Sequence, residues 1–116
     1  MHILIVEDEA LLARDLEAGA EDRGHTVAGP ASSVAAALPL VTEGLDAAVL
    51  DINLREGRSF PVARACLALG VPFVFLTGYA AMELPEDLAD AERLVKPVRH
   101  DRLFAALSRR DRGPRE

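Results

Sequence analysis

The chain has 116 residues, half of them hydrophobic, with 13 basic and 19 acidic side chains and a net charge of −6. This length fits one domain, and the single cysteine, Cys66, excludes a disulfide framework or a cysteine-based zinc cluster. The acidic balance argues against nucleic acid as the main partner, and no apolar run approaches the roughly 20 residues that span a bilayer. Because no basic region precedes the first apolar run, we expect no signal peptide and a cytoplasmic protein.

Short apolar runs alternate with stretches of helical spacing from the N-terminus onward. The run at 3–6 predicts a first strand, and over 12–20 a leucine or alanine recurs every four residues, as one face of a helix does. Gly24 follows, where a glycine commonly ends a helix. A weaker run at 26–28 predicts the second strand.

The second and third helices carry start signals and one conflict. Apolar residues at helical spacing over 34–41 and 62–69 each follow a serine that can cap a helix, Ser33 and Ser59. Pro39 lies inside the second stretch, where a proline removes a hydrogen bond and costs about 3 kcal/mol. We therefore expect a short or kinked second helix.

The remaining strands are predicted at 47–50, 73–76 and 94–95, and the first two are apolar enough to be buried on both faces. The segment between Gly78 and Arg93 has Pro85 in its middle and few large apolar residues, so a fourth helix at 85–91 should be short and poorly anchored. We expect this segment to be mobile, because few buried contacts give low local stability. A last helix around 103–107 completes the pattern.

Strands that alternate with helices predict an α/β fold, a doubly wound, five-stranded parallel sheet covered on both faces. We expect one domain over residues 1–110 and a frayed tail over 111–116.

Polar and charged side chains follow four of the five predicted strands, in the order Glu7-Asp8, Asp51, Thr77-Gly78 and Lys96-Pro97. The carboxyl ends of parallel strands share one edge of the sheet, where ligands bind, so we expect these groups to converge. Lys96 is the only lysine of the chain, against twelve arginines.

Three carboxylates at one edge cannot all be charged without compensation. Two like charges about 4 Å apart repel by about 4 kcal/mol at an effective dielectric constant of 20, and Lys96 offsets one charge. Either a carboxyl stays protonated or a divalent cation binds. Mg²⁺ suits hard oxygen ligands and shares its coordination shell with phosphate. A carboxylate beside it can accept a phosphoryl group.

The ordered set of acids, Thr77 and Lys96-Pro97 resembles the receiver domain of bacterial two-component response regulators, over roughly residues 2–109. The resemblance implies a flavodoxin-like (βα)5 fold with the strand order 2-1-3-4-5. Residues 72–79, Pro-Phe-Val-Phe-Leu-Thr-Gly-Tyr, also resemble an alphaproteobacterial single-domain branch known by its FATGUY motif, with Leu76 in place of the alanine.

The resemblance assigns the acceptor and the metal ligands. Asp51 would accept the phosphoryl group from phosphohistidine. Asp8, Asp51 and the backbone carbonyl of Asn53 would bind Mg²⁺ directly, and Glu7 would act through a water molecule.

The resemblance also assigns the residues around the attached phosphoryl group. Thr77 would hydrogen-bond it, Lys96 would pair with it, and Gly78 would leave room beside it. Pro97 would follow a cis peptide bond, which only X-Pro bonds adopt at tolerable cost.

One position departs from the usual pattern. Receivers commonly carry a switch aromatic three residues before the lysine, but Arg93 stands there. In the FATGUY-type branch a tyrosine after the Thr-Gly pair is thought to take that role, which makes Tyr79 the candidate switch aromatic. Simple packing is the other interpretation of Tyr79.

The resemblance implies a single-domain response regulator, a switch rather than a turnover enzyme. It would receive its phosphoryl group from a sensor histidine kinase or a histidine phosphotransferase, and would then bind a downstream protein or relay the group. We expect no nucleic acid contact and no membrane insertion, and a monomer or a weak phosphorylation-dependent dimer.

Two other functions stay open. An adaptor of the same fold would bind its partner without phosphorylation, although the complete acid set disfavours this. A phosphatase of the haloacid-dehalogenase type would need a second aspartate two residues after the nucleophile, where Asn53 stands.

Overall fold

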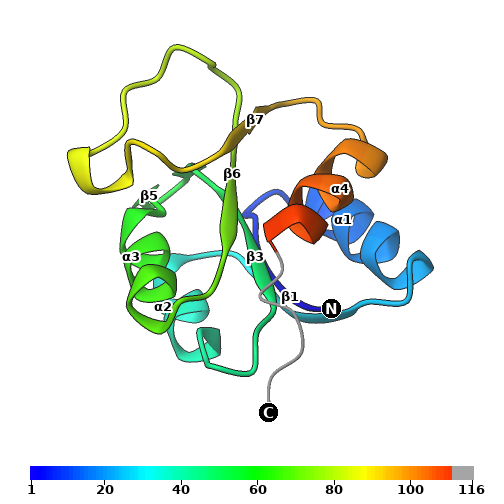
Figure 1. Ribbon diagram of the computed structural model, residues 1–116. Coiled ribbons are helices and arrows are strands. Elements are labelled where there is room, and N and C mark those ends of the chain that lie inside the picture. The colour runs from blue at the N-terminus through cyan, green and yellow to red at the C-terminus, as the bar shows by residue number, and fades with distance from the viewer. Residues whose placement is uncertain (111–116) are drawn as a thin grey trace.

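A five-stranded parallel sheet forms the centre of the computed structural model, which describes residues 1–110 (Figure 1). Its strands are β1 (His2–Val6), β2 (Thr26–Ala31), β3 (Ala47–Asp51), β6 (Phe73–Thr77) and β7 (Arg93–Val95). They lie in the order β2-β1-β3-β6-β7. Counted along the chain, this is the predicted order 2-1-3-4-5, so the predicted fold is confirmed. The tail predicted at 111–116 lies outside the described residues.

Helices cover both faces of the sheet (Figure 1). They are α1 (Ala10–Asp22), α2 (Val34–Ala37), α3 (Phe60–Leu69) and α4 (His100–Arg110), with 3₁₀ turns η1 (Leu38–Leu40) and η2 (Glu86–Leu88). Helices α2 and α3 lie on one face, and α1 and α4 lie on the other. None of the described helices combines the length and the apolar character needed to cross a membrane.

Each face of the sheet buries its own apolar cluster. One cluster contains Ala37 of α2 and Val62 of α3, and the other contains Leu16 of α1 and Leu107 of α4. Every residue of β3 and of β6 is buried, because these central strands are covered on both faces. This explains why their sequences are continuous apolar runs rather than alternating ones.

The second helix ends where its proline requires. Helix α2 stops at Ala37, and the chain continues through Pro39 as the 3₁₀ turn η1. The hydroxyl of Ser33 caps α2 by accepting from the amide of Ala36 at 3.0 Å. The capping prediction for Ser59 is wrong, because its backbone (ψ 10°) is not extended and its buried hydroxyl has no hydrogen-bond partner among residues 1–110.

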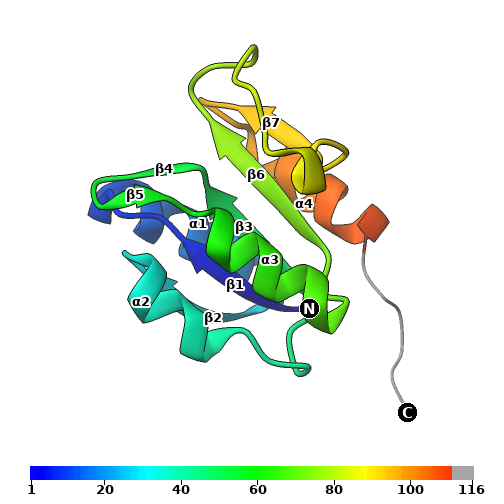
Figure 2. The same ribbon diagram turned by 90° about the vertical axis from the view of Figure 1, so that its left-hand side faces the viewer.

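Three short elements differ from the sequence expectation. The fourth helix expected at 85–91 is reduced to η2, which the buried Leu88 anchors. Strand β2 continues past the cis Gly29–Pro30 bond to Ala31. Two-residue strands β4 (Asn53–Leu54) and β5 (Gly57–Arg58) form an antiparallel hairpin (Figure 2) that is too short and too polar to give a periodic signal.

Candidate functional site

The polar residues predicted at the strand ends do meet at one edge of the sheet. Asp51 is the last residue of β3 and pairs in register with Leu76, next to Thr77, the last residue of β6. Thr77 in turn pairs with Val95, next to Lys96. Register alone therefore brings the ends of β3, β6 and β7 together.

Three carboxylates form a tight cluster at this edge. Glu7 and Asp8 follow β1, and each can place an oxygen within 4.8 Å of the other and of an oxygen of Asp51. Glu7 and Asp51 are buried, with 2% and 5% of their surfaces exposed, while Asp8 is half-buried. Carboxylates in this position are shielded poorly by solvent, so they need a cation or a proton.

Lys96 supplies one positive charge to the cluster. Its Nζ lies 2.8 Å from Oδ2 of Asp51 and 3.3 Å from Oε2 of Glu7. Burial alone would lower the pKa of the Lys96 ammonium, but the hydrogen bond and charge of Asp51, and then those of Glu7, raise it above the ordinary value. Lys96 therefore stays charged at neutral pH.

The surroundings of Glu7 favour its protonated form. Burial, the hydrogen bond with Asp51 and the charge of Asp51 raise the pKa of Glu7 from 4.5 to about 8, and the attraction of Lys96 opposes this only in part. The sequence alone is compatible with a protonated carboxyl or a bound cation. Where no cation is bound, the raised pKa of Glu7 favours the protonated carboxyl.

Asp8 is oriented by the chain that follows Asp51. Its Oδ2 accepts a hydrogen bond of 2.7 Å from the backbone amide of Arg55, at the tip of the β4–β5 hairpin. The Arg55 guanidinium itself is exposed and lies 3.8 Å from the same oxygen. Sequence patterns gave no sign of the Arg55 contact, because it depends on a hairpin of two-residue strands. The same hairpin carries Asn53, two residues after Asp51.

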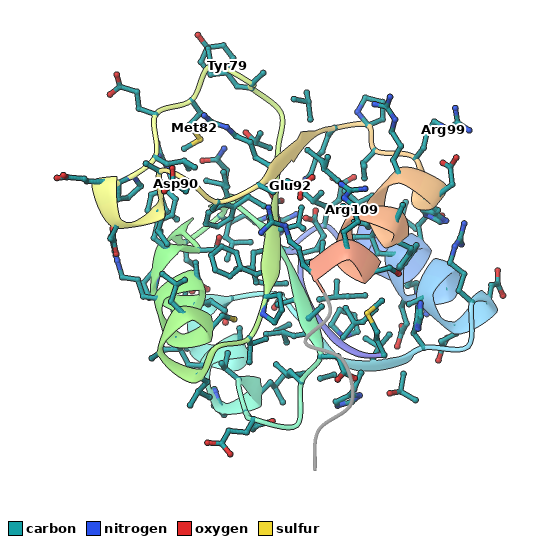
Figure 3. The ribbon with its side chains drawn as sticks, viewed as in Figure 1. Tyr79, Met82, Asp90, Glu92, Arg99 and Arg109 are labelled. Atoms are coloured by element: carbon teal, nitrogen blue, oxygen red, sulfur yellow. The ribbon has the colours of Figure 1, made fainter. Side chains whose placement is uncertain are left out.

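The hydroxyl of Thr77 is turned toward the loop that follows β6. Its Oγ1 accepts from the amide of Tyr79 at 3.1 Å, and its proton can be donated to the Tyr79 carbonyl at 3.3 Å or to Met82 Sδ at 4.0 Å. Gly78 and Tyr79 are exposed, and Figure 3 shows the Tyr79 ring at the outer end of this loop.

Two further features concern the last strand. The Lys96–Pro97 peptide bond is cis. Arg93, at the position where receivers commonly carry a switch aromatic, donates through Nη1 to the backbone carbonyl of Met82.

The donor set fits a hard divalent cation. Two carboxylates, those of Asp8 and Asp51, are held within a few ångströms of each other by different strands, and Glu7 can contribute a third once it loses its proton. Oxygen donors of this kind suit Mg²⁺ or Ca²⁺ rather than a metal that prefers nitrogen or sulfur.

Comparisons with known proteins place these residues in context. No model of a known protein family matches the chain. The phyllosphere-induced regulator PhyR of Methylorubrum extorquens is 34% identical over 91% of this chain and 42% of its own length. The response regulator protein PmrA of Pseudomonas aeruginosa is 35% identical over 97% of this chain and 55% of its own length. The chain thus spans about half the length of the curated relatives it matches.

Solved structures match over nearly their whole length. The solution structure of SdrG from Sphingomonas melonis is 43% identical, with a TM-score of 0.76, over 93% of this chain and 96% of that one. The crystal structure of a response regulator receiver protein from Sinorhizobium medicae is 30% identical, with a TM-score of 0.80, over 95% and 93% of the two chains.

Proposed function

Because the chain belongs to the receiver domains of response regulators, we propose that it is a phosphorylation-controlled switch in which Asp51 accepts a phosphoryl group from phosphohistidine. The observation that carries the proposal is the contact of 2.8 Å between Asp51 and Lys96 beside two further acids. A carboxylate beside a cation and two further acids at one edge of the sheet supports a nucleophile with a charge partner and candidate metal ligands.

In the reaction, an oxygen of Asp51 attacks the phosphorus atom as the bond from phosphorus to the imidazole nitrogen breaks. The donor imidazole leaves, and an aspartyl phosphate remains on Asp51. The protein's contribution to such a transfer is to position groups and to compensate charge. Lys96 already contacts the acceptor carboxylate, and after the transfer its ammonium can pair with the phosphoryl oxygens, which then carry the negative charge.

The carboxylates of Asp8 and Asp51 and the backbone carbonyl of Asn53 would hold Mg²⁺, with Glu7 acting through a water molecule. When bound, the ion supplies positive charge for the phosphoryl oxygens. Glu7 would then favour its charged form, since a second positive centre would compensate the cluster.

Thr77 links the site to the rest of the fold. Phosphorylation changes the charge on Asp51 from −1 to about −2 and adds strong acceptor oxygens. The Thr77 hydroxyl can donate to one of these only if it stops donating to Tyr79 or Met82, because it has a single proton. The loop after β6 is therefore the part of the fold expected to respond.

The donor would be a sensor histidine kinase or a histidine phosphotransferase in the cytoplasm. The output would be altered binding of a downstream protein, or passage of the phosphoryl group onward, by a receiver that acts alone. We propose a switch rather than a turnover enzyme, monomeric or weakly dimeric when phosphorylated. An adaptor that is never phosphorylated is the alternative that the following experiment excludes.

The test is phosphoryl uptake measured by mass spectrometry of the intact protein after incubation with phosphoramidate and Mg²⁺. The unaltered chain should gain the mass of one phosphoryl group, and Asp51→Asn should gain none. Asp90→Asn, which changes an exposed aspartate near η2, is the matched control and should behave as the unaltered chain. Uptake by Asp51→Asn would refute the assignment of the acceptor.

A further inference from the structure

Two side chains hold the loop after β6, residues 78–85, and they reach it from different strands. Thr77, at the end of β6, bonds to the first part of the loop at Tyr79. Arg93, at the start of β7, bonds to the carbonyl of Met82. A turn joins the two contacts, because the amide of Met82 donates to the carbonyl of Tyr79 at 3.2 Å.

The Arg93 side chain reaches the loop from the start of an edge strand. The side chain is half-buried, and no acid of the described residues forms an ion pair with it. Its bond to Met82 joins a charged donor to a backbone acceptor, and such bonds are roughly twice as strong as neutral ones. The neighbouring Glu92 is instead paired with Arg109 and Arg110 of α4 (Figure 3).

Hydrogen bonds between β6 and β7 hold the backbone of Arg93 in place. The amide of Phe75 donates to the carbonyl of Glu92, and the amide of Lys96 donates to the carbonyl of Thr77. Arg93 itself pairs in register with Phe75. The donor therefore sits on a strand bonded to the same β6 that carries Thr77, while its acceptor sits on the loop. A displacement of the loop relative to the sheet must break this bond.

We propose that Arg93 is a positioning residue, which stabilises the loop-bound conformation of Thr77 by holding the carbonyl of Met82. This inference rests on the proposed function, in which Thr77 leaves the loop to contact the phosphoryl group. By stabilising one of two conformations, Arg93 sets the fraction of molecules that have switched before any phosphorylation. The residue that replaces the usual aromatic thus acts through a hydrogen bond to the backbone.

Met82 provides the probe for a test. The chain has only two methionines, and the Met82 side chain packs against the apolar cluster on the α3 face, while Met1 packs against the other cluster. With ¹³C-labelled methionine methyl groups, the spectrum reports on the loop through Met82 and contains Met1 as an internal reference. Adding beryllium fluoride and Mg²⁺ should displace the Met82 signal and leave that of Met1 in place.

Arg93→Ala should displace the Met82 signal without beryllium fluoride, along the same line as the activated protein. Losing a bond from a charged donor changes an equilibrium by about tenfold or more. Arg93→Lys retains a cation that can still donate to the Met82 carbonyl, so it should displace the Met82 signal less than Arg93→Ala does. Arg93→Phe, which restores the usual aromatic but removes the donor, should resemble Arg93→Ala.

The matched control is Arg99→Ala. Arg99 is an exposed arginine that pairs with Asp101, and Figure 3 shows it at the start of α4, away from Met82. It should leave the Met82 signal unchanged. An unchanged signal in Arg93→Ala, or a displacement in an unrelated direction, would overturn the proposal, since the second outcome is what mere loosening of the loop produces. A Met82 signal in Arg93→Phe at the same position as in the unaltered chain would also overturn the proposal.

The same samples separate this proposal from the proposed function. The mass of the intact protein reports whether Asp51 has accepted a phosphoryl group. This readout does not depend on whether the loop moves. Uptake without any response of the Met82 signal to beryllium fluoride overturns the role of Arg93 and leaves Asp51 as the acceptor. Absence of uptake together with a displaced Met82 signal in Arg93→Ala would refute phosphorylation while retaining the contact between strand and loop.

Discussion

Replacing Glu7 by glutamine tests whether this buried carboxyl holds a proton when no cation compensates Asp51. Glutamine has nearly the same shape, cannot ionise, and can still donate to Asp51 and accept from Lys96. Burial first, and then the hydrogen bond and charge of Asp51, raise the pKa of Glu7 from 4.5 to about 8. The variant is therefore a model of the protonated state at every pH.

The sign of the effect follows from proton binding. Between pH 4.5 and 8 the folded protein retains a proton that the unfolded chain releases, so stability falls as pH rises through this window. A rise of the pKa from 4.5 to about 8, at about 1.36 kcal/mol per pKa unit, corresponds to a stability change on the order of 5 kcal/mol. The glutamine variant lacks this term. Glu7→Gln should therefore become progressively more stable than the unaltered chain from pH 5 to pH 8.

Urea denaturation between pH 5 and 9, without divalent cations, measures this difference. Glu21→Gln, which neutralises an exposed glutamate of α1, is the control and should differ from the unaltered chain by the same small amount at each pH. Adding Mg²⁺ at pH 8 should stabilise the unaltered chain more than Glu7→Gln, because only the former offers a third carboxylate. A stability difference that stays constant from pH 5 to pH 9 would refute the reasoning.

Three further substitutions follow from the geometry. Ser59→Ala should be neutral or stabilising by up to about 1 kcal/mol in urea denaturation, because the buried hydroxyl has no hydrogen-bond partner among the described residues. A clear loss of stability in this variant would mean that the hydroxyl does have a hydrogen-bond partner. A Cβ on Gly19 would lie 2.6 Å from Nδ1 of His100, so Gly19→Ala should cost about 1–3 kcal/mol. In a His100→Ala background the same change should instead stabilise by up to about 1 kcal/mol, since alanine favours a helix, and persistence of the loss there would contradict the steric reason. Lys96→Arg should impair phosphorylation-dependent partner binding while Mg²⁺ affinity is largely retained, because a planar guanidinium cannot replace a compact ammonium between Asp51 and Glu7; unchanged partner binding would contradict the role given to Lys96.

The fold and the membership of the site were predictable from sequence because both follow from local patterns. Strands β3 and β6 are buried on both faces, so their residues form the continuous apolar runs that identify them. A polar residue that ends such a run must lie at the carboxyl edge of the sheet. The sequence alone therefore predicts that Asp51 and Thr77 lie at this edge.

What only the tertiary structure decided involves atoms from segments far apart in the chain. The raised pKa of Glu7 depends on its burial and on its distances to Asp51 and Lys96, and the bond from Arg93 to Met82 depends on how the loop folds back on β7. Neither has a periodic signature. Ser59 shows that residue type and position can also mislead. A serine favours capping and stands at the N-cap position of α3, but its backbone angle prevents the capping hydrogen bond. Residue type and spacing determined which groups meet at the sheet edge, and packing determined their protonation and their partners.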